Sequence, residues 1–152
     1  MKDFIESYKQ KGLIREEDIG FDQTIKHLER AKKDLHAAEA NLEIDTEVSY
    51  NYAYLAMLRS GRALMFSLKY RPIDGEQHKT VVAFCENILE KENLEIINYF
   101  DRMRKKRNRF TYDEPELLIS ETETEQALKN AKEFVKIIYN YIQNNNPQKK
   151  LI

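Results

Sequence analysis

Basic side chains crowd residues 102–109, the part of this chain best equipped to bind an anion. Six Lys or Arg residues fall within those eight positions. A guanidinium group holds phosphate oxygens through paired hydrogen bonds, and an ammonium group holds them as a point charge. The block therefore predicts a phosphate-binding surface, with Lys105, Lys106 and Arg109 as candidate phosphate contacts.

Arg107 differs from its basic neighbours because it also continues an apolar stripe. At helical spacing, the stripe before it contains Leu94, Ile97, Phe100 and Met103. A guanidinium group on a core-facing position must find an acceptor, because burying it unpaired is very costly. Two interpretations stay open: a structural arginine with a buried partner, or a site residue at a protein interface.

Two further arginines, Arg59 and Arg62, lie among apolar residues of an earlier predicted helix. Each has a stem in apolar surroundings and a charged head that needs a partner. Asp101, Glu86 and Asp113 are plausible partners by composition. The pair is interpreted either as structural arginines that fix the register of the helices or as part of a binding site.

An acidic segment follows the basic block almost at once. It contains Asp113, Glu114, Glu116, Glu121, Glu123 and Glu125. Blocks of opposite charge are typical of solvated helix ends or of mutual pairing. Pairing of this kind would compete with a phosphate ligand for the same cations.

Motifs for metal or nucleophilic chemistry are absent from the sequence. It contains no GxGxxG, no phosphate-binding P-loop, no CxxC and no HExxH. Helical bundles with two metal ions use Glu-x-x-His, whereas only the reversed order His36-x-x-Glu39 occurs here. Cys85 lies in an apolar run and is expected to be a buried thiol. We therefore predict neither a metal nor a cofactor.

Helical periodicity accounts for nearly the whole chain. The predicted helices cover about residues 2–11, 22–42, 46–69, 77–89, 92–109 and 122–143. No alternating strand pattern is found. The prediction is an all-α protein, an up-and-down antiparallel bundle of four longer helices with additional short helices. Residues 1–143 form a single domain, and residues 144–152 form a frayed tail.

The third predicted helix, residues 46–69, is apolar nearly all round, so it is expected to be central or to lie at an interface. Together with the arginine on the stripe of the fifth helix, this pattern favours a homodimer. The net charge is −1, so no global field points to a polyanion. The single cysteine, with no signal peptide and no membrane-spanning run, predicts a cytoplasmic protein without membrane contact.

Several separated segments of the chain resemble the HEPN domain family over about residues 45–142. They are Tyr50-x-Tyr52-Ala53-Tyr54, Arg59-x-x-Arg62-Ala63-Leu64, Tyr70-Arg71-Pro72, His78-Lys79-Thr80-Val81-Val82 and Arg107-x-x-x-x-Tyr112-Asp113. The resemblance implies an all-α HEPN-like bundle, commonly a homodimer in which the arginine motifs of the two subunits face each other. Many members are metal-independent ribonucleases with the motif Arg-Asn-x-x-x-His, often the toxin of a pair whose other half is a small nucleotidyltransferase.

This chain departs from that motif at one position. Arg107-Asn108 matches its start, but Tyr112 stands where the histidine is expected. Metal-free RNA cleavage needs a group that titrates near neutrality to activate the 2′-hydroxyl, and tyrosine ordinarily titrates about three pH units too high.

The chain is most similar to a branch of HEPN proteins that lacks the histidine and has Tyr-Asp after the arginine. For that branch the resemblance implies a non-catalytic or weakly catalytic protein that binds a nucleotide or RNA, or that pairs with a nucleotidyltransferase. The expected binding residues are Arg59, Arg62, Lys105, Lys106, Arg107, Arg109, Tyr112 and Asp113. The alternative is a metal-independent toxin-like ribonuclease of a toxin–antitoxin pair, with Arg107, Asn108 and Tyr112 as its catalytic residues.

Overall fold

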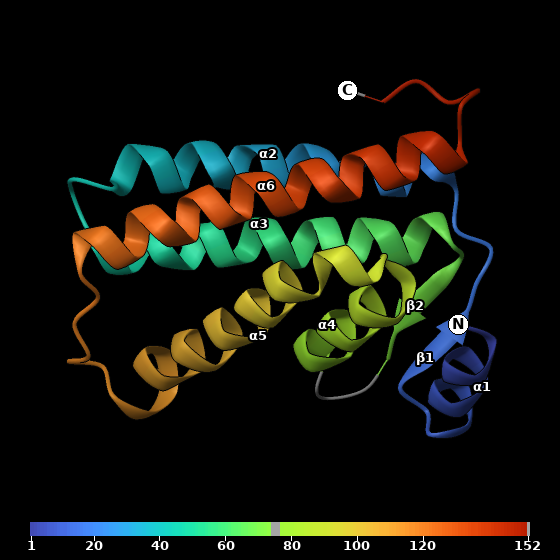
Figure 1. Ribbon diagram of the computed structural model, residues 1–152, viewed down its shortest axis with the longest axis horizontal. Helices are drawn as coiled ribbons and strands as arrows, with labels where there is room; N and C mark the ends of the chain where they lie inside the picture. The colour runs from blue at the N-terminus through green and yellow to red at the C-terminus, as the bar shows by residue number, and fades with distance from the viewer. Residues whose placement is uncertain (74–76, 152) are drawn as a thin grey trace.

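The computed structural model describes residues 1–73 and 77–151, and it confirms the all-α bundle. Its α-helices are α1 (Lys2–Gln10), α2 (Phe21–Asn41), α3 (Thr46–Ser67), α4 (Gln77–Ile88), α5 (Leu94–Asn108) and α6 (Glu121–Asn145). The four longer helices run up and down: α2 and α5 point one way, and α3 and α6 point the other (Figure 1). The shorter α1 lies at one end of the bundle, and α4 packs beside α3 and α5.

Helix α3 is the centre of the molecule. It packs most extensively against α2 and α6 and also contacts α4 and α5. Gly61 permits the close approach of α4, because a Cβ atom at this position would lie 2.5 Å from Cγ1 of Val81. The apolar surroundings predicted for this helix are therefore supplied within one chain, and they do not require a second copy.

Local signals explain where the central helices begin. The Asp45 carboxylate accepts hydrogen bonds from the backbone N–H groups of Glu47 and Val48 at 3.0 and 3.2 Å, as expected of an N-cap. The Ser120 hydroxyl does the same for Glu123 at 3.1 Å at the start of α6. Helix α3 ends before Lys69, whose φ of 70° is left-handed and incompatible with a continued helix.

A small antiparallel sheet is present although the sequence shows no alternating strand pattern. Strand β1 (Ile14–Glu16) pairs with β2 (Tyr70–Pro72), with Arg15 opposite Arg71. Glu17 directly follows β1, and its carboxylate accepts hydrogen bonds from the side chains of Arg15 at 2.8 Å and Arg71 at 3.0 Å. Strands of three residues are too short to show an alternating pattern, so the sequence carried no signal for them.

The chain does not leave the helical conformation at the predicted helix end near residue 109. A π-helical turn, η2 (Arg109–Asp113), continues directly from the α-helix. It keeps Phe110 buried against Tyr50, with 6.0 Å between ring centroids, while Tyr112 is 71% exposed. Wide turns of this kind are rare and frequently occur at functional sites.

The stripe on α5 and the C-terminal tail also differ from their predictions in detail. Ile97, Phe100 and Met103 are buried as predicted, but Leu94, the first residue of the helix, is exposed. Helix α6 extends two residues beyond the predicted end at residue 143. Gln143, in the last turn of α6, donates side-chain hydrogen bonds to the backbone carbonyls of Asn146 and Lys149, which follow the helix. Leu151 is buried with the core side chains.

Candidate functional site

A cleft of about 400 Å³ lies where the first turn of α4 meets the end of α5 and the turn η2. We call it the Arg107 cleft. Its lining residues are Gln77, His78, Lys79, Arg104, Arg107, Asn108 and Tyr112. Among the residues that the structure describes, the lining contains three cations and no carboxylate, so these side chains give the cleft a positive potential suited to an anion.

Arg107 is a cation of this cleft that remains able to bind a ligand. Its Nε donates a hydrogen bond to Oδ1 of Asn51 on α3 at 3.1 Å. Its guanidinium carbon lies 5.9 Å from the ring centroid of Tyr54 and 5.8 Å from that of Tyr112. Within the described ranges no carboxylate lies within 4 Å of it. An amide and two rings orient the guanidinium without neutralising it, so its terminal nitrogens keep their capacity for an anion.

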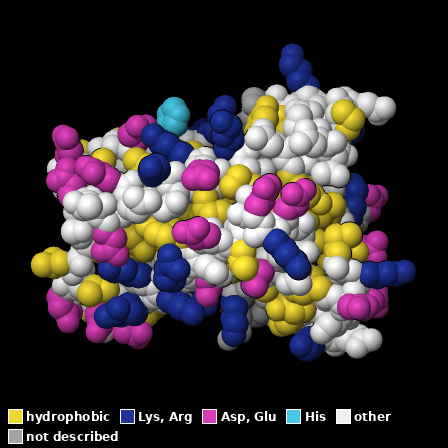
Figure 2. All heavy atoms as spheres, viewed as in Figure 1, with side chains coloured by type: hydrophobic (Ala, Val, Ile, Leu, Met, Phe, Trp, Pro, Cys, Tyr) yellow, Lys and Arg dark blue, Asp and Glu magenta, His cyan; other side chains and the backbone are white. Residues whose placement is uncertain are grey.

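Four neighbouring cations of the basic block are paired with carboxylates. Asp101 accepts a hydrogen bond from Arg104 at 2.8 Å and lies 3.3 Å from Lys105. Lys106 reaches Glu123 at 2.5 Å, and Arg109 reaches Glu114 at 2.8 Å. Figure 2 shows dark blue Lys and Arg side chains over the lower part of one face, where α5 runs, with magenta acidic side chains among them.

Fewer of the predicted basic residues line the cleft than the sequence composition indicated. Of the predicted binding residues, only Arg107 and Tyr112 line the cleft. Lys105, Lys106 and Arg109 lie outside its lining, and the acidic segment that was expected to compete for them supplies two of their partners. Asp113 is exposed and does not line the cleft. Asn108 does line it, as the motif implies.

Arg59 and Arg62 have partners other than those predicted. Arg59 Nη1 donates to both carboxylate oxygens of Asp34, at 2.6 and 2.5 Å, across the α2–α3 contact. Arg62 Nη2 donates to Oε1 of Gln77 at 3.1 Å. The sequence did not indicate Asp34, because a carboxylate on a core-facing helix position looks like an interruption of the apolar stripe. Arg59 therefore has a structural role, and Arg62 holds the side chain of Gln77, which lines the cleft.

His78 is a cleft residue that the sequence analysis did not select. Its Nδ1 lies 2.9 Å from the hydroxyl of Tyr54, which is fully buried in α3. Burial, together with the positive charges of Arg62, Arg107 and Arg104, lowers the pKa of His78 to about 4. Its imidazole is therefore neutral at physiological pH. The only signal for this residue in the sequence was its place in a segment that resembles the HEPN family.

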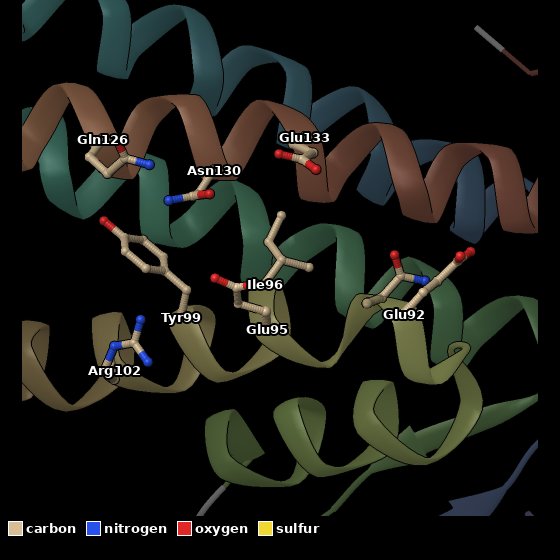
Figure 3. A pocket seen from close by; sticks show the side chains of 9 residues that line it. Glu92, Glu95, Ile96, Tyr99, Arg102, Gln126, Asn130 and Glu133 are labelled. Atoms are coloured by element: carbon tan, nitrogen blue, oxygen red, sulfur yellow. The ribbon is translucent and has the colours of Figure 1, made fainter.

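A second hollow of about 340 Å³ lies between α5 and α6 and has the opposite character (Figure 3). Three glutamates line it: Glu92, Glu95 and Glu133. The guanidinium carbon of Arg102 lies 5.3 Å from the ring centroid of Tyr99, which also lines this hollow. An anion is less favoured here than in the Arg107 cleft, because the carboxylates outnumber the single guanidinium group.

In residues 1–73 and 77–151, no group of three or more His, Cys, Asp and Glu side chains is arranged to hold a metal ion. None of the helices in the same ranges combines the length and apolar character needed to cross a bilayer.

Comparison with known families gives one match. The model of the HEPN domain matches residues 25–142, so the similarity begins about 20 residues before the range noted in the sequence and includes α2 from residue 25 onwards. No curated protein matches the chain. The matched range contains every residue that lines the Arg107 cleft.

Proposed function

Because the chain belongs to the HEPN family, whose domain implies a nucleotide- or RNA-related function, we propose that the Arg107 cleft binds a nucleotide or an RNA segment with little or no cleavage. One observation carries this proposal: Arg107 lies in a cleft without lining carboxylates and has no carboxylate partner among the described residues. The proposal places the chain in the HEPN branch that lacks the motif histidine.

The groups in the cleft favour binding over catalysis. Tyr112 occupies the motif position of the histidine, and a phenol is a poor proton acceptor near neutral pH. His78 does not replace it, because a side chain with a pKa of about 4 has little tendency to take a proton from a 2′-hydroxyl at pH 7. The other described groups of the lining are cations and amides, which hold a phosphate without activating it.

A nucleotidyltransferase is part of the proposal as a protein partner. Its support is the resemblance described above, in which HEPN proteins pair with small nucleotidyltransferases. The neighbouring open reading frame offers a direct check. We expect it to encode a Gly-Ser…Asp-x-Asp nucleotidyltransferase pattern, and the encoded protein should co-purify with this chain.

A ribonuclease of the toxin type is the alternative function. Asn108 and the exposed Tyr112 line the same cleft as Arg107, so all three residues of the degenerate motif meet one ligand space. This arrangement would support cleavage only if Tyr112 takes over the role of the motif histidine. Cleavage is therefore measured beside binding.

The first prediction concerns Arg107→Ala, which should weaken binding of a short single-stranded RNA by about 10- to 100-fold. A hydrogen bond to a charged group contributes about 1.5–3 kcal/mol. Arg102→Ala is the matched control, because Arg102 lies on the same helix but stacks on Tyr99 outside the cleft. Titrations at low and high salt should show wild-type affinity falling as salt rises. No binding by the wild type at low salt would contradict the proposal.

The same variants separate binding from cleavage. In EDTA, wild type and Arg107→Ala should both leave RNA essentially intact, and Tyr112→His should produce a trace of cutting if the remaining geometry suffices. Robust cutting by the wild type that vanishes in Arg107→Ala would establish the ribonuclease instead.

A further inference from the structure

The hydroxyl of Tyr54 has one polar partner among the described residues, Nδ1 of His78. Tyr54 is fully buried, with aromatic neighbours such as Phe100 at 5.8 Å between ring centroids. A buried phenol must donate its hydrogen, because an unsatisfied buried donor costs free energy. The Tyr54 O–H therefore donates to Nδ1, and Nδ1 is the acceptor.

This direction fixes the tautomer of His78. A neutral imidazole carries one hydrogen, so a ring whose Nδ1 accepts carries its hydrogen on Nε2. Burial and the surrounding guanidinium groups keep the ring neutral, as the lowered pKa shows. His78 thus presents a neutral N–H donor and has no free lone pair on the outer nitrogen.

The outer nitrogen is open to the cleft. Nε2 of His78 has no hydrogen-bond partner among the described residues, and it is not one of their buried unsatisfied atoms, which are Oγ1 of Thr24 and Nε of Arg62. His78 lines the Arg107 cleft, and its inner nitrogen is held by the core. The N–H on Nε2 is consequently available to a ligand that accepts hydrogen bonds.

We propose that His78 binds the ligand of the Arg107 cleft as a neutral Nε2–H donor, that Tyr54 is the positioning residue that fixes this tautomer, and that the ligand is a terminal phosphate monoester. This inference rests on the proposed function and names the ligand class of the same site.

The charges of the cleft support the choice of a monoester. Among the described residues, Lys79, Arg104 and Arg107 contribute three positive charges, and Asp101 offsets one of them from outside the lining. The remaining charge of about +2 matches a phosphate monoester, which carries about −1.5 to −2 near neutral pH, better than an internal phosphodiester with its single charge. A monoester also has more oxygens to accept the several donors around the cleft.

The tautomer is measured first, in the protein without ligand. Two-bond ¹H–¹⁵N spectra of the His78 ring at pH 7 should show Nε2 as the protonated nitrogen and Nδ1 as the bare one. In Tyr54→Phe this preference should be lost, whereas Tyr50→Phe, which removes a buried phenol hydroxyl from the same helix outside the cleft, should leave it unchanged. A hydrogen on Nδ1 in the wild type would overturn the inference, whatever the protein binds.

Binding is measured second, with adenosine 5′-monophosphate and the dinucleoside monophosphate ApA, which has only an internal phosphate. The wild type should prefer the monoester, and Tyr54→Phe and His78→Leu should each weaken its binding by about three- to tenfold. His78→Gln should restore most of the affinity, because its amide places an N–H near the position of Nε2.

The outcomes distinguish the two proposals. Equal affinity of wild type and His78→Leu for the monophosphate, with loss in Arg107→Ala, would overturn the inference and leave the proposed function standing. Preference for ApA would overturn the choice of monoester. No binding of either compound or of RNA by the wild type would contradict the proposed function itself, while the tautomer would still be read from the spectra.

Discussion

At the scale of single residues, charge compensation decides which cations of the basic block are available. Lys106 and Arg109 have the same formal charge as Arg107, yet each is within 3 Å of a carboxylate. Arg107 instead contacts an amide and two aromatic rings, which orient it at little electrostatic cost. The site therefore depends on what surrounds each charge rather than on the density of charges along the chain.

The lowered pKa of His78 predicts a pH-dependent stability. The folded pKa of about 4 lies below the ordinary value of 6.5, so the unfolded chain takes up the proton first as the pH falls. The stability associated with neutral His78 is fully present above pH 6.5 and is lost as the pH falls from 6.5 towards 4. The loss should be about 1–2 kcal/mol, after allowance for solvent screening of a partly exposed ring.

Urea unfolding of the wild type and His78→Gln between pH 7.5 and 4.5 measures this effect. Glutamine does not titrate, so the variant should lose less stability than the wild type over this range. The pKa of His27 is also lowered, mainly by burial, but it contributes to both proteins and cancels in the difference. Parallel pH profiles for the two proteins would contradict the prediction.

At the scale of secondary structure, one ion pair joins α2 to α3. The Asp34 carboxylate is 1% exposed and receives Arg59, with Arg30 a further 3.5 Å contact on its own helix. Burial raises the pKa of Asp34, and the pairing with Arg59 opposes that rise. A buried charge that keeps its partner fixes how the two helices are aligned, because sliding them would separate the pair.

Asp34→Ala should therefore destabilise the protein by about 2–4 kcal/mol, because it leaves the guanidinium group of Arg59 without a carboxylate. Glu39→Ala is the matched control on the same helix. It removes the exposed 3.0 Å pair with Lys132 and should cost less than about 1 kcal/mol. Chemical denaturation of both variants measures the difference, and equally small effects would show that the buried pair does not hold the helices.

At the scale of the whole molecule, the apolar surface of α3 no longer supports the predicted dimer, and the dimer itself stays a prediction. Helix α3 is covered by α2, α6, α4 and α5 of its own chain, so its apolar character says nothing about a partner. HEPN domains commonly dimerise, and the exposed side chain of Tyr112 lies at the Arg107 cleft. An interface at this position would place two copies of the segment 107–112 beside a shared cleft.

We therefore predict a homodimer of about twice 18.1 kDa in sedimentation experiments at tens of micromolar. Tyr112→Glu should shift it towards the monomer by placing a charge in the interface. Leu94→Glu, at the opposite end of α5, changes another exposed apolar side chain and should leave the dimer intact. A monomeric wild type, or equal effects of the two substitutions, would exclude this interface.

The sequence by itself determined the helices and the bundle. Periodic apolar residues and N-caps such as Asp45 act on residues a few positions away, so a short stretch of sequence is enough to predict a helix. The same local information singled out Arg107 as the unusual cation. It was silent on the two short strands, whose pairing joins residues far apart in the chain.

Only the tertiary structure decided the partners and hence the site. Arg59 meets Asp34 across 25 positions, Tyr54 meets His78 across 24, and Arg107 meets Asn51 across 56. The packing of the helices determines these pairs, and a local sequence pattern contains no information about that packing. The physical reason is that the availability of a charge and the tautomer of a histidine depend on neighbours in space, and those neighbours are defined only once the helices are packed.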